Sequence, residues 1–255
     1  MTEPTTSSPY DAPDLYDLLF DKLDFDVPFW LDVAREAKGP VLEAACGTGR
    51  ILLRLRWDGI DADGFDSNPA MIARLRKKAQ RGEMTVRAEV ADMREFSMGR
   101  RYALAFCAFN GFAHLETTKD QVRALEKLYE HLLPGGSLFL HMSYPGPAYW
   151  LEPEGTPVLE QEIKRPGGGM LQLWDNRTKD VVGQRQVSEV EIRESDATGN
   201  LLSIHRYKTS QRWVYRYELE LLFRAAGFLS WEIFGGFDRR PLKTPEDQII
   251  ARAFR

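Results

Sequence analysis

The sequence predicts an α/β fold, in which a mostly parallel sheet is covered by helices on both faces and carries an inserted antiparallel β layer. Strand-like and helix-like segments alternate between residues 40 and 142, which is the pattern of a parallel sheet. The segment "YALAFCAF" (102–109) is apolar throughout, as a strand buried on both faces is. Residues 145–213 show no convincing helical pattern.

The parallel part begins with the strand "PVLEAA" and continues in strand–helix units. Strands are predicted at residues 40–45, 60–66, 84–90, 102–109 and 137–142. Helices are predicted at residues 49–57, 69–80 and 119–132. The second helix has Asn68 as its N-cap and Pro69 at its first position, and both residue types favour a helix start.

The second half of the chain departs from this rhythm. "SEVEIRE" and "LLSIHRYKTS" alternate polar and apolar residues around the turn-forming "SDATGN", which predicts antiparallel hairpins. "VYRYELELLFRAAGF" predicts a helix that stops at Gly227, followed by two closing strands, "SWEIFGGF" and "QIIARAFR". The predicted organisation is an N-terminal tail with capping helices (1–38), an α/β domain (39–144 and 214–255) and an inserted layer (145–213).

Composition excludes several classes of protein. The 255 residues are 43% hydrophobic and 28% charged with a net charge of −4, and no apolar run reaches the length of a membrane span. The first residues lack the pattern of a signal peptide, and the two cysteines, Cys46 and Cys107, have no metal or redox spacing. We therefore expect a cytoplasmic protein without membrane or nucleic-acid partners. The basic stretch 74–81 continues an apolar helix and is interpreted as its solvated side.

An acidic run precedes the first strand. Seven aspartates fall within the 22 residues from 11 to 32, and Lys22 is the only basic residue in that stretch. The aspartates are Asp11, Asp14, Asp17, Asp21, Asp24, Asp26 and Asp32. One interpretation is a solvated helix face. The other is a negative entrance that favours a cationic cofactor or an amine.

The turn after the first strand, in "VLEAACGTGRILL", indicates the type of ligand. Gly47 and Gly49 fit a dinucleotide fingerprint, but its third glycine position is Leu52. Glu43 lies within the motif, where a pyrophosphate would be repelled. This pattern argues against a nicotinamide-dependent oxidoreductase and suits S-adenosylmethionine, which has a positive sulfonium and no phosphate.

Two further carboxylates follow the next strands. Asp66 ends the second strand, where it can accept hydrogen bonds from both ribose hydroxyls. Asp92 follows the third strand, where it can accept from an adenine amino group, and Met93 can pack on the base. Each feature alone has a structural explanation: Asp66 as a helix-start acid, Asp92 as a turn residue and the glycine turn as a tight connection. Their order at the ends of strands one, two and three favours a binding site.

With these residues in place, the sequence resembles the class I S-adenosylmethionine-dependent methyltransferases. The motifs "VLEAACGTG", "GFDSNPAMI", "ADM" and "LLPGGSLFL" carry the resemblance over residues 39–142. It implies a Rossmann-like sheet of seven strands whose last strand is antiparallel. Ala45 stands where the family commonly has glycine, so we expect a negative φ there. The cofactor-binding residues that the motifs and the resemblance imply are Tyr16, Glu43, Ala45, Gly47, Gly49, Asp66, Ser67, Met71, Asp92, Met93 and Asn110.

A closer resemblance lies in "CAFNGFAHL" (107–115), which is similar to the corresponding loop of glycine N-methyltransferases and of amino-sugar N-methyltransferases. It implies that Asn110 and His114 face the transferred methyl group. Glycine N-methyltransferases place an arginine on strand five to bind the substrate carboxylate. This chain has Met142 at about that position, which argues against glycine as the acceptor.

Methyl transfer needs an aligned acceptor, exclusion of water and removal of a proton. His114 is either the general base or a residue that holds the loop by a hydrogen bond. Tyr16 lies on a helix that closes over the cofactor in the resembling families, and is otherwise an interface aromatic. The insertion 145–213 corresponds to their substrate lid, and most of its aromatics are interpreted as packing residues.

The sequence thus predicts methylation of a small molecule, with nitrogen of an amine favoured as the acceptor atom. Two alternatives remain open: a small-molecule O-methyltransferase, and a non-catalytic S-adenosylmethionine-binding partner subunit. "FNGFAHL" lacks the Pro-Pro-aromatic clamp of enzymes that methylate a flipped adenine. No metal-ligand cluster is evident in the sequence, and a homo-oligomer is possible.

Overall fold

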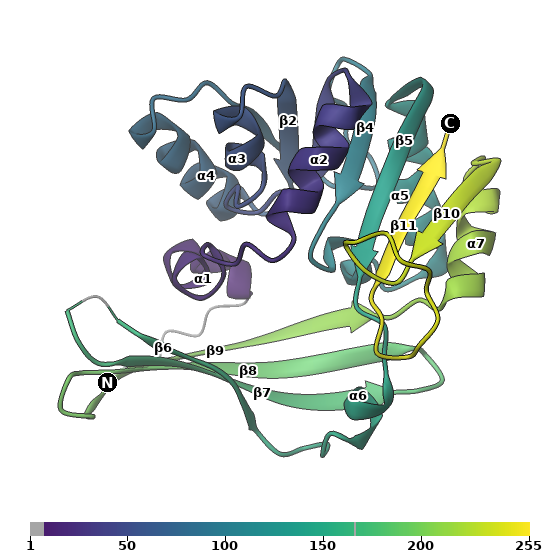
Figure 1. Ribbon diagram of the computed structural model, residues 1–255. Helices are drawn as coiled ribbons and strands as arrows, with labels where there is room; N and C mark the ends of the chain where they lie inside the picture. The colour runs from purple at the N-terminus through teal and green to yellow at the C-terminus, as the bar shows by residue number, and fades with distance from the viewer. Residues whose placement is uncertain (1–7, 166) are drawn as a thin grey trace.

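The computed structural model describes residues 8–165 and 167–255 and contains two sheets (Figure 1). The larger sheet has seven strands in the order β10-β11-β5-β4-β1-β2-β3. In chain order its strands are β1 (Val41–Ala44), β2 (Ala62–Asp66), β3 (Arg87–Val90), β4 (Tyr102–Cys107), β5 (Leu132–Met142), β10 (Ser230–Phe234) and β11 (Ile249–Phe254). β11 pairs antiparallel with both β5 and β10, whereas the other pairings of this sheet are parallel, so the predicted mostly parallel sheet is confirmed.

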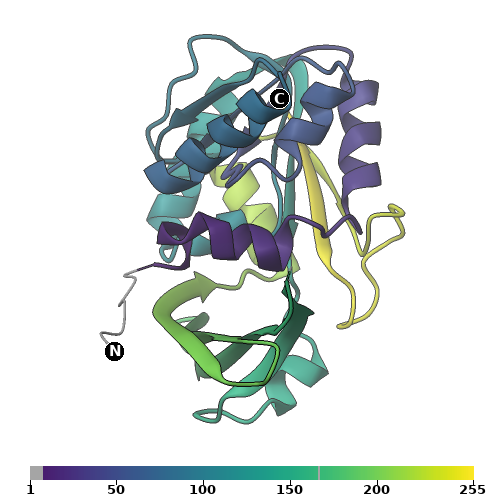
Figure 2. The ribbon, with the colours of Figure 1, turned by 90° about the vertical axis from the view of Figure 1, so that its left-hand side faces the viewer.

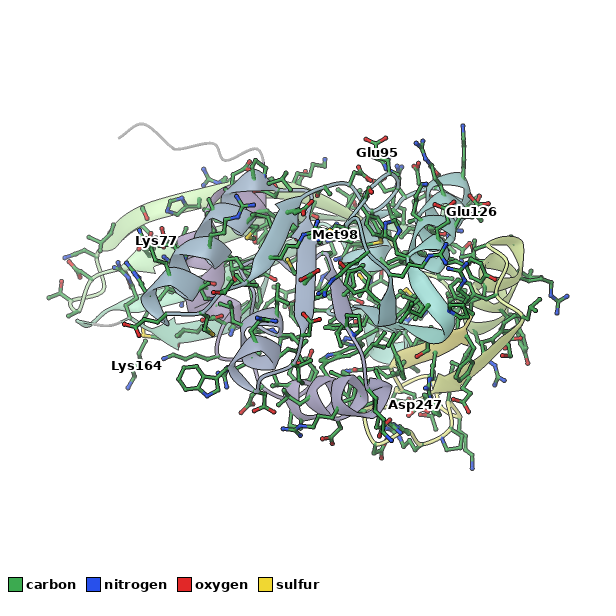
Figure 3. All side chains as sticks on the ribbon, turned by 90° about the horizontal axis from the view of Figure 1, so that it is seen from above. Lys77, Glu95, Met98, Glu126, Lys164 and Asp247 are labelled. Carbon is green, nitrogen blue, oxygen red and sulfur yellow. The ribbon has the colours of Figure 1, made fainter. Side chains whose placement is uncertain are left out.

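Helices cover both faces of this sheet. The core on one face includes residues of α2 (Val27–Ala37), α3 (Leu52–Trp57) and α4 (Pro69–Arg81). The core on the other includes residues of α5 (Thr118–Glu130) and α7 (Arg216–Ala225). Figure 3 shows Lys77 and Glu126 on the outer sides of α4 and α5, and both are exposed, whereas Met98 is buried. The central strands β1 and β4 are buried from both sides, which explains their largely apolar sequences, whereas the edge strands β3 and β10 are partly exposed.

The second sheet is antiparallel, with β6 (Val158–Lys164), β7 (Met170–Asp180), β8 (Arg185–Ser195) and β9 (Leu201–Arg212) in sequence order. It lies across one end of the larger sheet, and α1 (Pro13–Phe20) lies between the two (Figures 1 and 2). Leu19 of α1 packs with Leu171, Leu173 and other apolar side chains of the second sheet. The inserted antiparallel layer is confirmed. A short helix, α6 (Pro147–Leu151), corrects the expectation that residues 145–213 hold no helix.

Several predicted boundaries were wrong for local reasons. The helix predicted from residue 49 begins at Leu52, because Gly49 has a φ of +85° and still belongs to the turn. β3 begins at Arg87 instead of residue 84. β5 begins at Leu132, five residues before the predicted start at residue 137. Its pairing with β4 shifts register, so that "LPGG" is included in the strand. β10 ends at Phe234, before the two glycines that follow it.

Ala45 contradicts the expectation of a negative φ. Its φ is +55°, in the left-handed region that costs an alanine about 1–2 kcal/mol. The turn therefore keeps the backbone geometry for which glycine is suited, although this chain carries a methyl group there.

We predict that Ala45→Gly leaves stability unchanged or raises it by up to about 1 kcal/mol, because relief of the left-handed strain outweighs the greater freedom of glycine in the unfolded chain. Urea denaturation measures this. The matched control is Ala44→Gly in the extended strand β1, which is expected to lose about 0.5–1 kcal/mol or more. Equal losses in both variants would contradict the prediction.

Part of the acidic run forms ion pairs, and four of its aspartates are exposed: Asp11, Asp14, Asp24 and Asp32. Asp17 of α1 pairs with Arg74 (2.6 Å) and Lys78 (3.2 Å) of α4, while Asp14 pairs with Arg74 and Asp21 with Lys78, each at 2.5 Å. The basic stretch 74–81, interpreted as a solvated side, supplies these partners. The two charge runs therefore hold α1 against α4.

Candidate functional site

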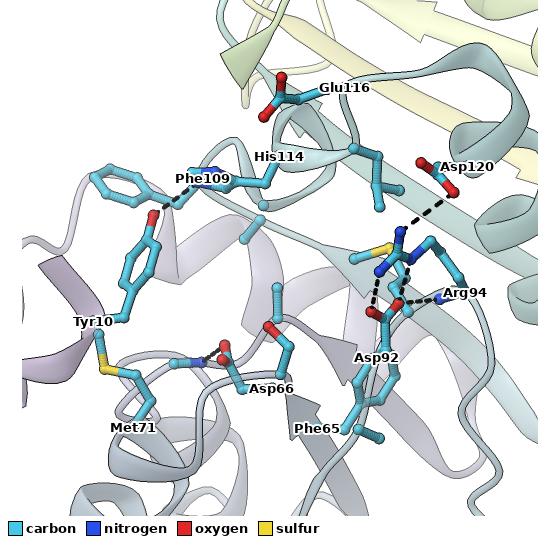
Figure 4. A pocket seen from close by; sticks show the side chains of 18 of the residues that line it. Tyr10, Phe65, Asp66, Met71, Asp92, Arg94, Phe109, His114, Glu116 and Asp120 are labelled. Atoms are coloured by element: carbon cyan, nitrogen blue, oxygen red, sulfur yellow. Dashed lines mark hydrogen bonds and ion pairs between the residues drawn. The ribbon is translucent and has the colours of Figure 1, made fainter. Parts of the chain in front are cut away.

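A cavity of about 430 Å³ lies where β1, β2, β3 and β4 end (Figure 4). The carboxyl ends of β1 and β4 are neighbours, since Ala44 pairs with Cys107, and the chain leaves these two strands in opposite directions across the sheet. This is where ligands bind in open α/β sheets. The cavity brings together His114 and eight residues predicted to bind the cofactor: Tyr16, Ala45, Gly47, Asp66, Ser67, Met71, Asp92 and Met93.

Asp66 is held by the backbone of two turns. Its Oδ2 accepts a hydrogen bond from Gly47 N (2.9 Å) and its Oδ1 accepts one from Asn68 N (2.9 Å). An ionised carboxylate has about four acceptor positions, so two remain for hydroxyl groups of a ligand. Asn68 in turn caps α4 by accepting from Ala70 N and Met71 N, as predicted. Burial raises the pKa of Asp66, and the two backbone donors oppose that shift.

Asp92 has a partner that the sequence did not suggest. Arg94 donates to it through its backbone N (2.8 Å), Nε (2.9 Å) and a terminal nitrogen (2.6 Å), and also pairs with Asp120 (3.3 Å). The Arg94 guanidinium lowers the pKa of Asp92, which keeps it ionised as an acceptor. Arg94 therefore orients Asp92 at the cavity wall, as Figure 4 shows.

The charges around this cavity favour a cation. Four acidic residues line it against one basic residue: Asp66, Asp92, Glu116 and Asp120 against Arg94. Gly47 presents open space, since an added Cβ would meet nothing within 4 Å. A sulfonium compound fits this setting better than a dinucleotide, whose pyrophosphate would be repelled.

Two predicted cofactor residues, Glu43 and Gly49, do not line the cavity. Glu43 is 4% exposed, burial raises its pKa, and its Oε2 lacks a hydrogen-bond partner among the described residues. Gly49 packs against α4, where an added Cβ would lie 2.8 Å from Leu75 Cγ. Both residues lie behind the turn and shape it.

His114 lies on the wall of the cavity, at the end of the short 3₁₀ helix η2 (Gly111–His114). Its Nδ1 is 3.2 Å from the Ser210 carbonyl, which can only accept, so Nδ1 carries the proton. Nε2 is then an acceptor, and the Tyr10 hydroxyl donates to it at 2.7 Å. Burial lowers the pKa of His114, so the ring is neutral near pH 7.

A second cavity of about 330 Å³ lies on the other side of this loop. Asn110 and Ala113 line it, whereas Phe109, Gly111 and His114 line the first cavity. Two roles are expected for Asn110 from the sequence, one facing the transferred methyl group and one binding the cofactor. Its side chain lines the second cavity, where it accepts from Ser143 N (2.6 Å) and donates to Ser143 Oγ (2.9 Å). The loop is thus a shared wall between two cavities.

Two residues near the site, Tyr10 and His141, were not predicted from the sequence. Tyr10 precedes the predicted helix and has no motif around it, yet it lines the first cavity and contacts Tyr16, with ring centroids 6.0 Å apart. His141 was assigned to surface or core. Its Nδ1 accepts from Phe109 N (3.1 Å), and its Nε2 donates to Gln248 Oε1 (2.9 Å). Burial lowers the pKa of His141 to about 4, so a neutral ring supports the loop.

Across residues 8–165 and 167–255, no three His, Cys, Asp or Glu side chains are grouped so that they could hold a metal ion. Within the same ranges, every helix is too short or too polar to cross a bilayer.

Comparison with known proteins agrees with this geometry. A model of the methyltransferase domain family matches residues 41–136. The dTDP-3-amino-3,6-dideoxy-alpha-D-glucopyranose N,N-dimethyltransferase of Streptomyces fradiae is 29% identical over 117 residues, which are 46% of this chain and 42% of that protein. The glycine/sarcosine N-methyltransferase of Parasynechococcus marenigrum is 28% identical over 239 residues, 90% of this chain and 78% of that protein. The match thus spans less than half the length of the first relative and most of the second.

Solved structures share the fold. The CcbJ methyltransferase from Streptomyces caelestis has a TM-score of 0.76 at 22% identity, covering 96% of this chain and 97% of that one. The S-adenosylmethionine-bound CalS10, an amino pentose methyltransferase from Micromonospora echinaspora, has a TM-score of 0.69 at 22% identity, covering 100% of both chains. The domain match thus shows a methyltransferase domain over residues 41–136, and the solved methyltransferase structures share the fold of nearly the whole chain.

Proposed function

We propose that this protein transfers a methyl group from S-adenosylmethionine to the nitrogen of a small-molecule amine. The observation that carries the proposal is the loop 109–114, which separates the two cavities and carries His114. The first cavity would hold the cofactor and the second the acceptor. The two relatives described above are both named as N-methyltransferases, which supports nitrogen over oxygen.

The residues of the first cavity have distinct proposed roles. S-adenosylmethionine, when bound, supplies an electrophilic methyl group on a positively charged sulfur. Asp66 would accept from the ribose hydroxyls and Asp92 from the adenine amino group, while Met71 and Met93 supply apolar wall. Tyr16 closes the cavity from α1, with its ring 4.8 Å from that of Phe20.

The residues between the cavities would remove a proton from the acceptor. An amine must present its lone pair to the methyl group and lose a proton, and neutral His114 offers Nε2 as the proton acceptor. In this structure Tyr10 and the Gln211 amide (3.3 Å) both donate to that nitrogen, so they must yield their positions, or Tyr10 must pass the proton on. The second sheet covers the acceptor cavity through Arg177, Gln186 and Gln211, which fits a substrate lid.

The direct test is transfer of labelled methyl from S-adenosylmethionine to matched pairs of small amines and their hydroxyl counterparts. We expect label in the amine products. Transfer only to the alcohols would favour the O-methyltransferase alternative, and binding of S-adenosylhomocysteine without transfer to any acceptor would favour the non-catalytic subunit.

We predict that Asp66→Ala weakens binding of S-adenosylhomocysteine by about 1–3 kcal/mol, because ligand hydroxyls and the Gly47 amide lose their acceptor. Isothermal titration calorimetry measures the change. The control is Asp63→Ala on the same strand, whose carboxylate pairs with Arg100 and Tyr102 away from the cavity. It is expected to lose stability while keeping affinity. Unchanged affinity in Asp66→Ala would remove Asp66 from the cofactor site.

A further inference from the structure

Two arginines of the second sheet, Arg177 and Arg212, line the second cavity. At first sight they replace the strand-five arginine that this chain lacks at Met142, and would bind a substrate carboxylate. Their hydrogen bonds argue otherwise, because both guanidinium groups are already committed to protein acceptors.

Arg177 is surrounded by three carboxylates. Its Nε donates to Asp175 (2.8 Å), and its two terminal nitrogens pair with Glu152 (2.8 Å) and Glu160 (3.0 Å). The Arg177 side chain is only 20% exposed, so these pairs are poorly screened by water.

Arg212 is committed in the same way. Its side chain is 9% exposed, and it pairs with Glu218 at 2.5 Å. It also donates to Gln121 Oε1 (3.0 Å) and Gln184 Oε1 (2.9 Å). Its guanidinium is therefore a structural group that ties β9 to α5 and α7.

Carboxylates outnumber the two guanidinium groups that they pair with, and Lys179 Nζ lies nearby, 4.6 Å from the centroid of the Tyr149 ring. Two guanidinium groups face four carboxylates: Glu152, Glu160 and Asp175 on Arg177, and Glu218 on Arg212. Burial raises the pKa of Asp175, but three carboxylates remain even when Asp175 is neutral. An anion entering this cavity finds no basic side chain, among the described lining residues, that lacks a carboxylate partner.

The remaining polar groups of the cavity are neutral. Asn110, Ser143, Gln186 and Gln211 offer amides and a hydroxyl. The Tyr149 hydroxyl is buried without a hydrogen-bond partner among the described residues, and a buried polar atom of this kind is a candidate contact for a ligand. The Tyr149 ring meets Trp213 edge-on, with centroids 5.9 Å apart, so the wall is aromatic as well as polar.

We propose that the acceptor cavity selects amines whose remaining part carries no anionic group, and that Glu152 and Glu160 determine this selectivity by neutralising Arg177. This proposal rests on the proposed function, since it assigns the second cavity to the acceptor. Selectivity of this type acts against the wrong ligand, because an anion would be desolvated beside guanidinium groups whose charges are already matched by carboxylates.

The experiment compares glucosamine with glucosamine 6-phosphate, which carry the same amine and differ in one anionic group. Binding to the S-adenosylhomocysteine-loaded protein is measured by saturation-transfer NMR, which needs no methyl transfer. We expect glucosamine to bind at least about tenfold more tightly, and glycinamide to exceed glycine in the same way.

The double variant Glu152→Gln/Glu160→Gln removes two of the three carboxylates paired with Arg177 and leaves Asp175, and we expect it to bring the ratio of neutral to anionic binding near one. The control is Glu162→Gln on β6, whose carboxylate accepts from Gln172 instead, and it should keep the wild-type ratio. The proposal is overturned if the wild type prefers the phosphate, if the double variant keeps its ratio, or if neither member of a pair binds. Failure of methyl transfer with an intact binding ratio would instead overturn the proposed function.

Discussion

Replacing Asp26 by alanine is expected to destabilise the protein by about 3–5 kcal/mol, because it leaves the buried guanidinium of Arg50 without a carboxylate partner. Asp26 is fully buried and accepts from Arg50 at 2.5 and 2.8 Å and from Trp30 Nε1 at 3.1 Å. The Arg50 side chain is only 10% exposed, so water cannot replace the carboxylate. Urea denaturation, with the free energy of unfolding extrapolated to water, measures the loss.

Two further variants separate charge burial from general damage at this position. Asp32→Ala removes an ion pair to Arg35 whose side chains are 54–65% exposed, so its loss should stay within about 1 kcal/mol. Asp26→Leu/Arg50→Met removes both charges, and should recover much of the stability lost in Asp26→Ala. A loss below about 1 kcal/mol in Asp26→Ala would mean that Arg50 does not depend on this pair.

This pair also matters for the site. Arg50 lies 5.3 Å from the centroid of the Phe109 ring, at the start of the loop that separates the two cavities. Asp26→Ala is therefore expected to weaken cofactor binding as a secondary effect, through movement of this loop.

The second large effect is expected for His114→Ala, which should lower kcat by about a hundredfold, since general-base assistance typically contributes that much or more. Cofactor affinity should change far less, because Asp66 and Asp92 are left in place. Single-turnover kinetics with saturating S-adenosylmethionine, combined with calorimetry, measure the two effects separately. Equal losses in turnover and affinity would make His114 a scaffold residue.

The pH profile distinguishes a proton acceptor from a scaffold. Burial holds the pKa of His114 below its usual value of about 6.5, so Nε2 is free of its proton above that pH. Turnover should be flat above about pH 7 and fall as the pH drops through the lowered pKa. In His114→Ala this acidic limb should disappear. Tyr10→Phe removes the hydroxyl that occupies Nε2, and should keep the limb while altering its position.

The sequence alone was sufficient for the sheet and for the turns at its carboxyl ends. Those features depend on neighbours along the chain: apolar runs form buried strands, Asn68 caps α4 two and three residues ahead, and Gly47 serves a tight turn. The order of Asp66, Asp92 and the loop 109–114 then follows from parallel topology, which brings the carboxyl ends of successive strands to one edge.

The tertiary structure alone decided which charges are free and which side chains meet. Tyr10 contacts His114, which is 104 residues away in the sequence, and Arg50 contacts Asp26, which is 24 residues away. No periodic pattern in the sequence predicts either pair. Packing likewise decided three other features: the positive φ of Ala45, the ion-pair partners of the acidic run and the neutralisation of Arg177. Local patterns encode backbone conformation and burial, whereas the pairing of polar groups depends on distant segments meeting in three dimensions. For this protein the sequence therefore determined the kind of cofactor site, and the tertiary structure determined the ion pairs around the second cavity.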